Sequence, residues 1–310
     1  MATERELRNR IRSVRNIGQV TRALEAVSAS KVRKAQAQVL ATRPYAIKAW
    51  QVLVNVSSQE SASADVHPLL EVREQIQSVS ILLLTSDRGL CGAFNTNIFR
   101  KTLEFIHACR WPVTLVTAGR KGRDLMYRSG QRISADFRIP DPPSVLDVTP
   151  IARTVIDDFT AGQTDVVYLA YMDFVNTLVQ RPVVRRLLPL RPSQLEDQVM
   201  AEYLEDVPEL SDRRFEYLYE PSPAAILNEV LPRFTELQVF QAVLESLASE
   251  HSARMVAMRN ATENAEALVE ELILARNKAR QAMITGELLD IAGGAEALAQ
   301  AVESAGATFR

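Results

Sequence analysis

A run of 53 residues, from Arg233 to Thr285, contains neither proline nor glycine. These two residue types most often end or interrupt a helix, so a run of this length favours one continuous helix. At 1.5 Å per residue such a helix would be about 80 Å long, several times the length of a helix in an ordinary globular domain. A helix this long needs a partner to cover its apolar residues.

The first 43 residues are also free of proline and contain a single glycine, Gly18. They predict a second long helix, so that two long helices bracket the rest of the chain. Residues 1–34 carry nine Lys and Arg against three acids, whereas residues 224–310 carry seven against twelve Asp and Glu. Helices of opposite charge whose neighbours along the chain lie in one central domain can pair antiparallel. Exposed ion pairs contribute only about 0 to 1 kcal/mol each, so the charges alone do not establish the pairing.

Residues suited to a helix–helix seam recur every three or four positions along both segments. One four-residue step between His251 and Met255 breaks the heptad order and indicates a local change of supercoil. Several positions hold small or polar residues where a tight coiled coil prefers Leu, Ile or Val. We expect a long antiparallel coiled coil with weakly packed stretches; the alternative is an ordinary two-helix hairpin packed on its own domain. The predicted seam is Leu7, Ile11, Val14, Gly18, Thr21, Glu25, Ser28, Val32, Ala35 and Val39, with an adjacent stripe of Ile17, Val20, Leu24 and Val27, and then Leu237, Phe240, Leu244, Leu247, His251, Met255, Met258, Thr262, Ala265, Val269, Leu272, Arg276, Ala279 and Met283.

The middle of the chain has a different period. Ser80–Thr85 is an apolar run that ends in the turn Ser86–Gly89, which is typical of a strand buried on both faces. Strand and helix candidates then alternate and predict a parallel, Rossmann-like α/β sheet. We expect coiled-coil helices at residues 1–60 and 223–310 and the α/β domain at 70–222. The other expected strands are Val113–Thr117, Ala135–Ile139, Val166–Phe174, Val183–Leu190 and Phe215–Tyr219, the last two making the sheet mixed, and the expected helices are Asn95–Ala108, Lys121–Arg128 and Val148–Thr160.

The loop Ser86–Asn97 follows a strand and precedes a helix, with Gly89 and Gly92 placed as in a phosphate-binding loop. It lacks the third glycine of a dinucleotide fingerprint and the Gly-Lys-Ser/Thr of a P-loop. Cys91 has no histidine close in sequence, which favours a small buried thiol over a nucleophile. The alternative of a nucleotide-binding enzyme predicts saturable ATP binding by the isolated chain.

A second loop, Gly119-Arg120-Lys121-Gly122, matches the GXXG with which KH domains hold a nucleic-acid backbone. Four residues are a weak signal, and the net charge of the chain is −2 rather than basic. We interpret the loop as a solvated turn; the alternative function is a helical scaffold or nucleic-acid-binding adaptor, which would bind with a steep salt dependence. The sequence has no HExxH, GxSxG or carboxylate pair beside a histidine, so we expect no catalytic residues, no cofactor and no metal site.

The composition narrows the class of protein. With 47% apolar and 24% charged residues, the 310-residue chain resembles a soluble protein. No apolar stretch approaches the roughly 20 residues needed to cross a bilayer, so any membrane role is expected to be peripheral. Two cysteines, Cys91 and Cys109, form no CxxC pair, which favours a reduced compartment. Glu4 and Glu6 in the Arg-rich start argue against a transit peptide.

Three segments, at the two ends and in the middle, match the sequence of a known family. They are RNRIRSVRNIGQVTRALEAVSASKVRKAQ (Arg8–Gln36) with ATRPYA (Ala41–Ala46), then SDRGLCGAFNTN (Ser86–Asn97), and SEHSARMVAMRNATENAEALVEELILARNKARQAMITGELLDIAGGAEAL (Ser249–Leu298). In that order they resemble the N-terminus, a central segment and the C-terminal signature of the gamma subunit of F-type ATP synthases. The resemblance spans nearly the whole chain.

The resemblance implies a fold and a function. The terminal helices would form an antiparallel coiled coil inside a ring of three alpha and three beta subunits, with the α/β domain standing on the membrane rotor. Rotation of this non-catalytic shaft would drive the beta subunits through open and closed states and couple ion flow to ATP synthesis or hydrolysis. The implied partners are the alpha, beta and epsilon subunits and the c-ring, without nucleic acid or a small-molecule substrate. The implied location is the cytoplasmic face of a bacterial plasma membrane, to which the complex holds the chain peripherally.

The resemblance also assigns contacts with a beta subunit, where Arg–carboxylate pairs would give directional, reversible interactions. One set lies on the C-terminal helix, and the other is a basic cluster near an acidic lever of the beta subunit. The chain departs from the family at Ala26, Gly18 and Gly286, where Met or another helix former is common. Gly286 lies among the contact residues of the C-terminal helix, and a glycine inside a helix costs about 1 kcal/mol relative to alanine. The two sets are Arg280, Gln281, Thr285 and Glu287, and Lys31, Arg33 and Lys34.

Overall fold

The computed structural model describes residues 3–60, 67–190 and 222–307. The chain divides into two compact units. We call residues 1–26 with 258–310 the coiled-coil unit, and residues 27–257 the sheet unit. The two long helices contribute to both units. The domain boundaries expected from the sequence stay predictions.

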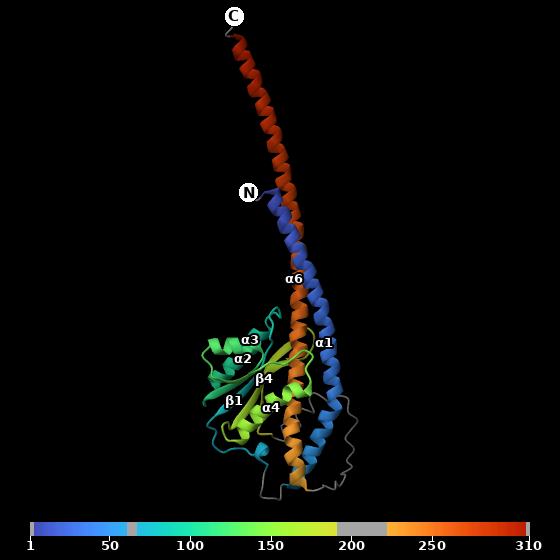
Figure 1. Ribbon diagram of the computed structural model, residues 1–310, viewed down its shortest axis with the longest axis vertical. Helices are drawn as coiled ribbons and strands as arrows, with labels where there is room; N and C mark the ends of the chain where they lie inside the picture. Colours follow the sequence, from blue (N-terminus) through green and yellow to red (C-terminus); the bar gives the residue numbers. More distant parts are fainter. Residues whose placement is uncertain (1–2, 61–66, 191–221, 308–310) are drawn as a thin grey trace. The chain divides into compact units, whose positions relative to one another are not determined.

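The terminal segments are long helices, as the sequence predicted (Figure 1). Helix α1 runs over Glu4–Glu60 and α6 over Pro223–Ala307. Each continues through a proline, Pro44 in α1 and Pro232 in α6. Proline removes one backbone donor and crowds the preceding turn. Each helix therefore extends beyond the proline-free run that indicated it.

The sheet unit contains five described strands in the order β3-β2-β1-β4-β5. The first four are parallel to one another, and β5 pairs antiparallel with β4. Parallel neighbours need crossover helices, whereas β4 and β5 are joined by a hairpin. The result is the mixed, Rossmann-like α/β sheet that the sequence predicted. The strands are β1 (Val79–Leu84), β2 (Val113–Ala118), β3 (Ile133–Phe137), β4 (Val166–Phe174) and β5 (Gln180–Leu188).

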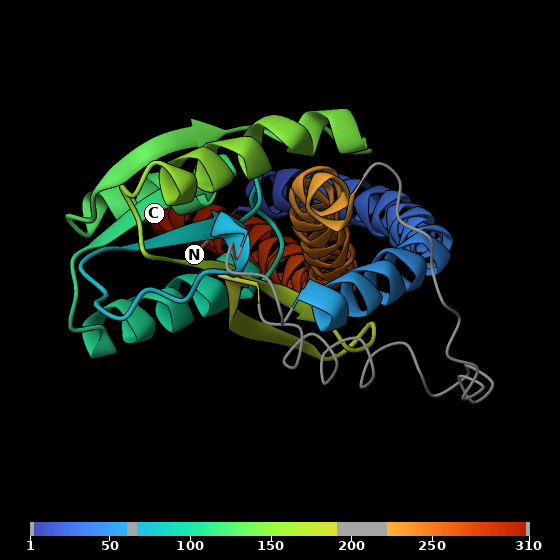
Figure 2. The same cartoon turned by 90° about the horizontal axis from the view of Figure 1, so that it is seen from below.

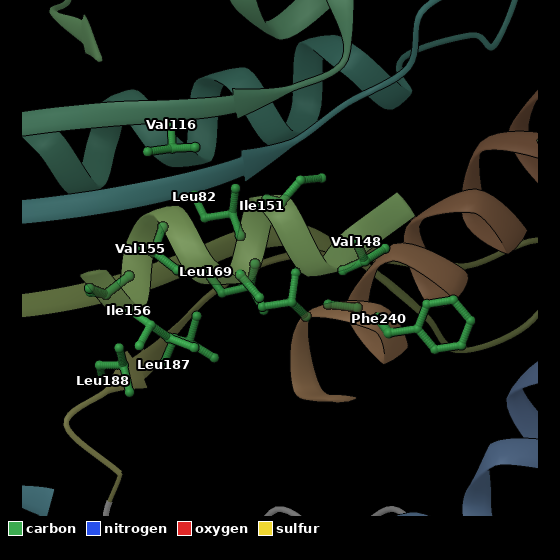
Figure 3. Packing of buried hydrophobic residues seen from close by; sticks show 14 of the residues in the cluster. Leu82, Val116, Val148, Ile151, Val155, Ile156, Leu169, Leu187, Leu188 and Phe240 are labelled. Atoms are coloured by element: carbon green, nitrogen blue, oxygen red, sulfur yellow. The ribbon is translucent and has the colours of Figure 1, made fainter. Parts of the chain in front are cut away.

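One face of the sheet packs against α4 (Val145–Thr160) and against residues 227–244 of α6. Aliphatic and aromatic side chains from the strands and from both helices meet there (Figure 3). Burying one such side chain stabilises the fold by roughly 1.5–3 kcal/mol. The residues labelled in the figure are Leu82, Val116, Val148, Ile151, Val155, Ile156, Leu169, Leu187, Leu188 and Phe240.

The opposite face of the sheet is covered by α2 (Phe94–Ala108) and α3 (Arg120–Arg128). Figure 2 shows α2 on the other side of the sheet from α4. Strand β1 is buried along its whole length because both of its faces are covered, and its sequence is accordingly apolar except for Ser80. A short 3-10 helix, η1 (Pro68–Leu70), precedes this strand.

Arg73 ties the segment before β1 to the start of β4 by an ion pair and to the end of α4 by a hydrogen bond. Arg73 Nη1 lies 2.7 Å from Asp165 Oδ1, and its Nη2 donates to the carbonyl oxygen of Phe159 at 2.7 Å. Asp165 also accepts the backbone N–H groups of Gln77 and Ser78. Burial by itself would raise the pKa of Asp165, but Arg73 and the two N–H groups outweigh it and hold the pKa below its ordinary value.

The described elements of the sheet unit lie within a few residues of their predicted positions. Strand β4 coincides with the predicted Val166–Phe174, and β5 begins and ends slightly earlier than the predicted Val183–Leu190. Helix α4 begins before its predicted start, because the carboxylate of Asp147 accepts the N–H of Ser144 at 2.8 Å and completes the first turn. The predicted strand Phe215–Tyr219 lies outside the described residues.

Candidate interaction surface of the long helices

In the coiled-coil unit, α1 and α6 run antiparallel and in close contact. The hydroxyl oxygens of Thr21 and Thr262 lie 2.7 Å apart. A methyl group added at Gly18 would lie 3.5 Å from the Cβ of Ala265. Small seam residues therefore let the two backbones approach closely. The buried seam positions in this unit are Leu7, Ile11, Thr21, Met258, Thr262, Ala265 and Val269, all of which the sequence predicted.

Two ion pairs flank this seam. Arg22 pairs with Glu266, and Arg259 lies 3.0 Å from Glu25. In the first pair the cation belongs to α1 and the acid to α6, whereas in the second pair the cation belongs to α6 and the acid to α1. Both arginine side chains are more than 60% exposed, so each pair contributes at most about 1 kcal/mol. The seam, rather than the charge contrast between the segments, therefore holds the helices together.

The last part of α6 has no partner helix among the described residues. The contacts of Thr21 with Thr262 and of Gly18 with Ala265 set the register, which places Glu4, the first residue of α1, opposite Ala279. We call residues 280–307 the free end of α6. From 280 to 298 every residue except the half-buried Gly286 is exposed. The large apolar side chains, 47–70% exposed, are Met283, Ile284, Leu288, Leu289, Ile291 and Leu298.

The first predicted contact set lies on this free end. Residues three or four positions apart share a stripe on a helix. Arg280 and Glu287 therefore lie on one stripe with Ile284, while Gln281 and Thr285 share the next. All four predicted residues are exposed. Polar groups alternate with apolar ones along this surface, which suits a protein partner better than water alone.

Helix α1 carries another apolar surface outside the seam. Ile17 and Val20, which belong to the stripe adjacent to the predicted seam, are 56% and 59% exposed. Leu24 continues the stripe and is half-buried. The outer side of the coiled-coil unit therefore presents apolar groups that the two helices do not cover themselves.

The second predicted set lies in the part of α1 that belongs to the sheet unit. Arg33 and Lys34 are exposed. Lys31 differs, because its Nζ lies 2.6 Å from Asp141 Oδ2 in the loop between β3 and α4. The same oxygen lies 3.1 Å from Nε2 of the buried His251 on α6. Sequence reasoning missed this cluster, since its members are far apart in the chain and no local spacing connects them.

Helix α6 also lies across the carboxyl ends of β1 and β4, where open α/β sheets usually bind their ligands. Ser249 Oγ donates to the carbonyl oxygen of Met172 at 3.2 Å, at the end of β4. Arg254 donates to the carbonyl oxygen of Gly89, in the loop after β1. A Cβ added at Gly92 in the same loop, where φ is +56°, would lie 3.9 Å from the Cβ of Ala257 on α6. The loop that resembles a phosphate-binding loop therefore packs against a helix of its own chain.

Cys91, in this loop, is buried, as the sequence predicted. Burial raises the pKa of its thiol, and the bond to Ser86 offsets this only in part. Its Sγ accepts a hydrogen bond from Asn95 Nδ2 at 3.1 Å. A thiol that stays protonated near neutral pH is a poor nucleophile.

The glycines of the second loop are required by packing. Gly119 has φ of +115°, and a Cβ added there would lie 2.1 Å from the carbonyl oxygen of Thr85. A Cβ on Gly122 would lie 2.5 Å from Thr85 Oγ1, which accepts the N–H of Gly122 at 2.8 Å. The loop is the turn from β2 into α3, which begins at Arg120. Close approach to β1 accounts for both glycines without a ligand.

Within the described part of the chain, no helix is long and apolar enough to cross a membrane. Among the same residues, no group of three or more His, Cys, Asp or Glu side chains could hold a metal ion.

Comparisons with known proteins agree with the long helices and the α/β sheet. A family model described as ATP synthase matches residues 3–298. The chain is 48% identical over 300 residues to an ATP synthase gamma chain of Dehalococcoides mccartyi (strain CBDB1), covering 96% of this chain and 100% of the relative. It is 46% identical over 303 residues to an ATP synthase gamma chain of Chloroflexus aurantiacus (strain ATCC 29366 / DSM 635 / J-10-fl), covering 96% and 99%.

Solved structures show the same fold at lower identity. A chain of the Euglena gracilis mitochondrial ATP synthase (OSCP/F1/c-ring, rotational state 3) has a TM-score of 0.65 and 20% identity, over 95% of this chain and 94% of that one. A chain of the Tetrahymena thermophila mitochondrial ATP synthase (central stalk/c-ring) has a TM-score of 0.57 and 24% identity, over 78% and 99%. From the family model and the full-length relatives, the chain belongs to the ATP synthase gamma chain family.

Proposed function

We propose that the chain is the central-stalk rotor shaft of an F-type ATP synthase. In this role it is a non-catalytic subunit that couples ion flow through the membrane sector to the conformational cycling of catalytic beta subunits, for ATP synthesis or hydrolysis. Membership in the gamma chain family supports the proposal. So does the similarity of its fold to chains of a mitochondrial central stalk and of a mitochondrial rotor.

The free end of α6 is the observation that carries the proposal. It is exposed on all sides over residues 280–298. At 100° per residue, five of its six large apolar side chains lie within a sector of about 140°, and Leu289 and exposed alanines lie on the other sides. A helix that docks on one surface hides one stripe and leaves the rest polar. A helix with apolar groups all round is suited to a surrounding sleeve of protein, here the ring of alpha and beta subunits.

Within this sleeve we assign the contacts with a beta subunit to the two predicted sets. Arg280, Gln281, Thr285 and Glu287 present charged and polar groups from exposed positions on the free end. In the second set, Arg33 and Lys34 are exposed, whereas Lys31 would have to share its ammonium with Asp141. Charge-assisted hydrogen bonds between these residues and a beta subunit are strong enough to hold the shaft in one rotational position. They can break and form again with the next beta subunit as the shaft turns.

The remaining partners follow from the role of a rotor. The sheet unit would contact the epsilon subunit and the c-ring, and the complex would hold the chain at the cytoplasmic face of a bacterial plasma membrane. The sheet has the apolar core of a self-supporting domain. It can therefore bear on other rotor parts without depending on them for its fold.

The test is reconstitution of the purified chain with matching alpha and beta subunits. We expect a stable complex that hydrolyses ATP. A chain ending at Gln281 lacks most of the free end and should lose a large part of this turnover, because Thr285 and Glu287 are gone. A chain ending at Leu298, the last residue that the family model matches, is the control and should behave as the full chain does. Absence of a complex would contradict the proposed function, and unchanged turnover of the Gln281 chain would remove the contact assigned to the free end.

A further inference from the structure

A polar cluster in the sheet unit joins three segments around His251, a residue of α6 with 3% of its surface exposed. Its Nε2 lies 3.1 Å from Oδ2 of Asp141, in the loop from β3 to α4. The same carboxylate oxygen lies 2.6 Å from Nζ of Lys31 on α1. One carboxylate oxygen that belongs to the sheet therefore contacts both long helices.

Arg254 extends the cluster by one turn of α6. Its Nη1 lies 3.2 Å from His251 Nδ1, and its Nη2 lies 2.6 Å from Glu250 and also donates to the carbonyl oxygen of Gly89. A guanidinium can only donate, so His251 Nδ1 is the acceptor and Nε2 carries the proton that faces Asp141. Nε2 makes no regular hydrogen bond, although Asp141 Oδ2 lies 3.1 Å away. The imidazole is nevertheless held between a donor on one side and a carboxylate on the other.

These contacts leave α6 in different directions. Successive residues of an α-helix are rotated by about 100°, so the side chains of His251 and Arg254 point roughly 160° and 140° away from that of Ser249. Ser249 contacts the end of β4, His251 the loop after β3, and Arg254 the loop after β1. Polar contacts that are made on several sides of a helix oppose rotation of the helix about its own axis. Apolar packing opposes this rotation less strongly, because it is not directional.

His251 contributes to the cluster as a neutral group. Burial lowers its pKa to about 4, against the opposing effect of Asp141. Near neutral pH it is therefore a polar link with one donor and one acceptor. A neutral amide side chain of similar reach can in principle supply the same two groups.

We propose that Lys31, Asp141 and His251 form a joint that locks α1 and α6 to the α/β sheet, and that they are positioning residues for the transmission of torque. The inference rests on the proposed function, since only a rotating shaft has to carry torque between its helices and its sheet. Lys31 then has a partner inside the chain in addition to the proposed contact with a beta subunit, whereas its exposed neighbours Arg33 and Lys34 belong to that contact alone. When the joint is weakened, the helices can turn against the sheet, and part of each rotation is lost.

The experiment uses the chain reconstituted in lipid vesicles with matching alpha and beta subunits and the membrane sector. ATP hydrolysis and the ATP-driven membrane potential, followed with a voltage-sensitive dye, are measured together. In His251→Leu, which cannot link Arg254 to Asp141, hydrolysis should persist while charge transported per ATP falls roughly threefold or more, because charge-assisted contacts of the joint are lost. Lys31→Met keeps the aliphatic stem and removes only the ammonium at a half-buried position, and should lower the same ratio.

Two further variants separate torque transmission from general stability. His251→Gln keeps a donor and an acceptor and should restore the ratio of the unaltered chain. Arg153→Ala removes an exposed link between α4 and α6 in the same unit, whose Nε lies 3.6 Å from Glu236, and should change nothing. If the His251→Leu chain fails to assemble, the ratio of charge to ATP in Lys31→Met tests the joint. An unchanged ratio of charge to ATP in Lys31→Met, or in an assembled His251→Leu complex, would overturn the joint, whereas failure of the unaltered chain to support hydrolysis would overturn the proposed function beneath it.

Discussion

The core of the sheet unit and the seam of the coiled-coil unit are built from different residues. Ile81, Leu82 and Leu83 on β1 have no exposed surface. The seam instead relies on residues such as Thr21 and Thr262, whose hydroxyl groups meet at its centre. Beyond the seam, α6 exposes large apolar side chains. One region is thus stabilised by its own packing, while the other keeps apolar surface for other chains to cover.

The largest expected difference between the regions comes from adding one methyl group. Gly119→Ala would place a Cβ 2.1 Å from the carbonyl oxygen of Thr85 and force φ of +115° on an alanine. We expect the free energy of unfolding of the sheet unit to fall by about 4 kcal/mol or more, or the unit not to fold. Hydrogen exchange of the β1 and β2 amides measures this.

The matched control is Gly130→Ala. Gly130 also has a positive φ, of +76°, but an added Cβ would meet nothing within 4 Å. It should cost only about 1 kcal/mol, from backbone strain alone. Equal effects of the two substitutions would show that close packing against Thr85 is not the reason why position 119 requires glycine.

The next effect tests the polar clamp of the sheet unit. Asp165→Asn removes the charge that Arg73 and two backbone N–H groups bind, and should lower the free energy of unfolding by about 2–3 kcal/mol. Because the folded-state pKa of Asp165 lies below its ordinary value near 3.8, its contribution is present above that value and is lost as pH falls through the folded-state pKa.

Urea unfolding at pH 7 and at pH 3, followed by the sheet amides, measures this dependence. The difference between Asp165→Asn and the unaltered chain should shrink at the lower pH. A difference that grows on acidification would show that the carboxylate is not stabilised in the fold.

A smaller effect is expected at the seam. Thr21→Val or Thr262→Val alone leaves one hydroxyl without its cross-helix partner and should cost about 1 kcal/mol. Replacing both together should cost less than the sum of the two, because the one contact between the hydroxyls is already lost in each single variant. Hydrogen exchange of the α1 amides near these residues gives the three values. Additive costs would indicate that the two hydroxyls do not interact.

The smallest effect should have the opposite sign to that of Gly119→Ala. An added Cβ at Gly286 meets nothing within 4 Å, and its helix continues on both sides. Gly286→Ala should therefore stabilise the helix locally by about 1 kcal/mol, seen as slower amide exchange around Thr285. Gly18→Ala, whose Cβ would make an ordinary 3.5 Å contact with Ala265, serves as the comparison within the paired seam. Faster exchange in Gly286→Ala would contradict the open surroundings of that residue.

Local patterns predicted much of this fold because periodicity is a property of neighbouring residues. The seam positions Leu7 and Val269 and the buried strand β1 were all readable from spacing. The run without proline ended at Arg43, whereas α1 continues through Pro44 to Glu60, because proline removes only one backbone donor from the helix.

Contacts between distant residues left no such pattern. Lys31 and Asp141 are 110 positions apart, and His251 looked like one more imperfect seam residue. The glycines beside Arg120 were compared with a nucleic-acid loop because their partner, Thr85, precedes them by more than thirty residues. The residues of the free end of α6 came from resemblance to a family, because an exposed helix carries no sign of which partner it contacts.

The central claim is that this chain turns inside a ring of catalytic subunits. The direct measurement is single-molecule rotation of a probe attached at Lys101→Cys, an exposed position on α2, in a complex with matching alpha and beta subunits fixed to a surface. Cys109→Ser removes the half-buried native thiol beforehand, and Cys91 is buried. The proposal predicts rotation in one direction that requires ATP and stops when ATP is exhausted. ATP hydrolysis by the complex with a stationary probe would contradict it.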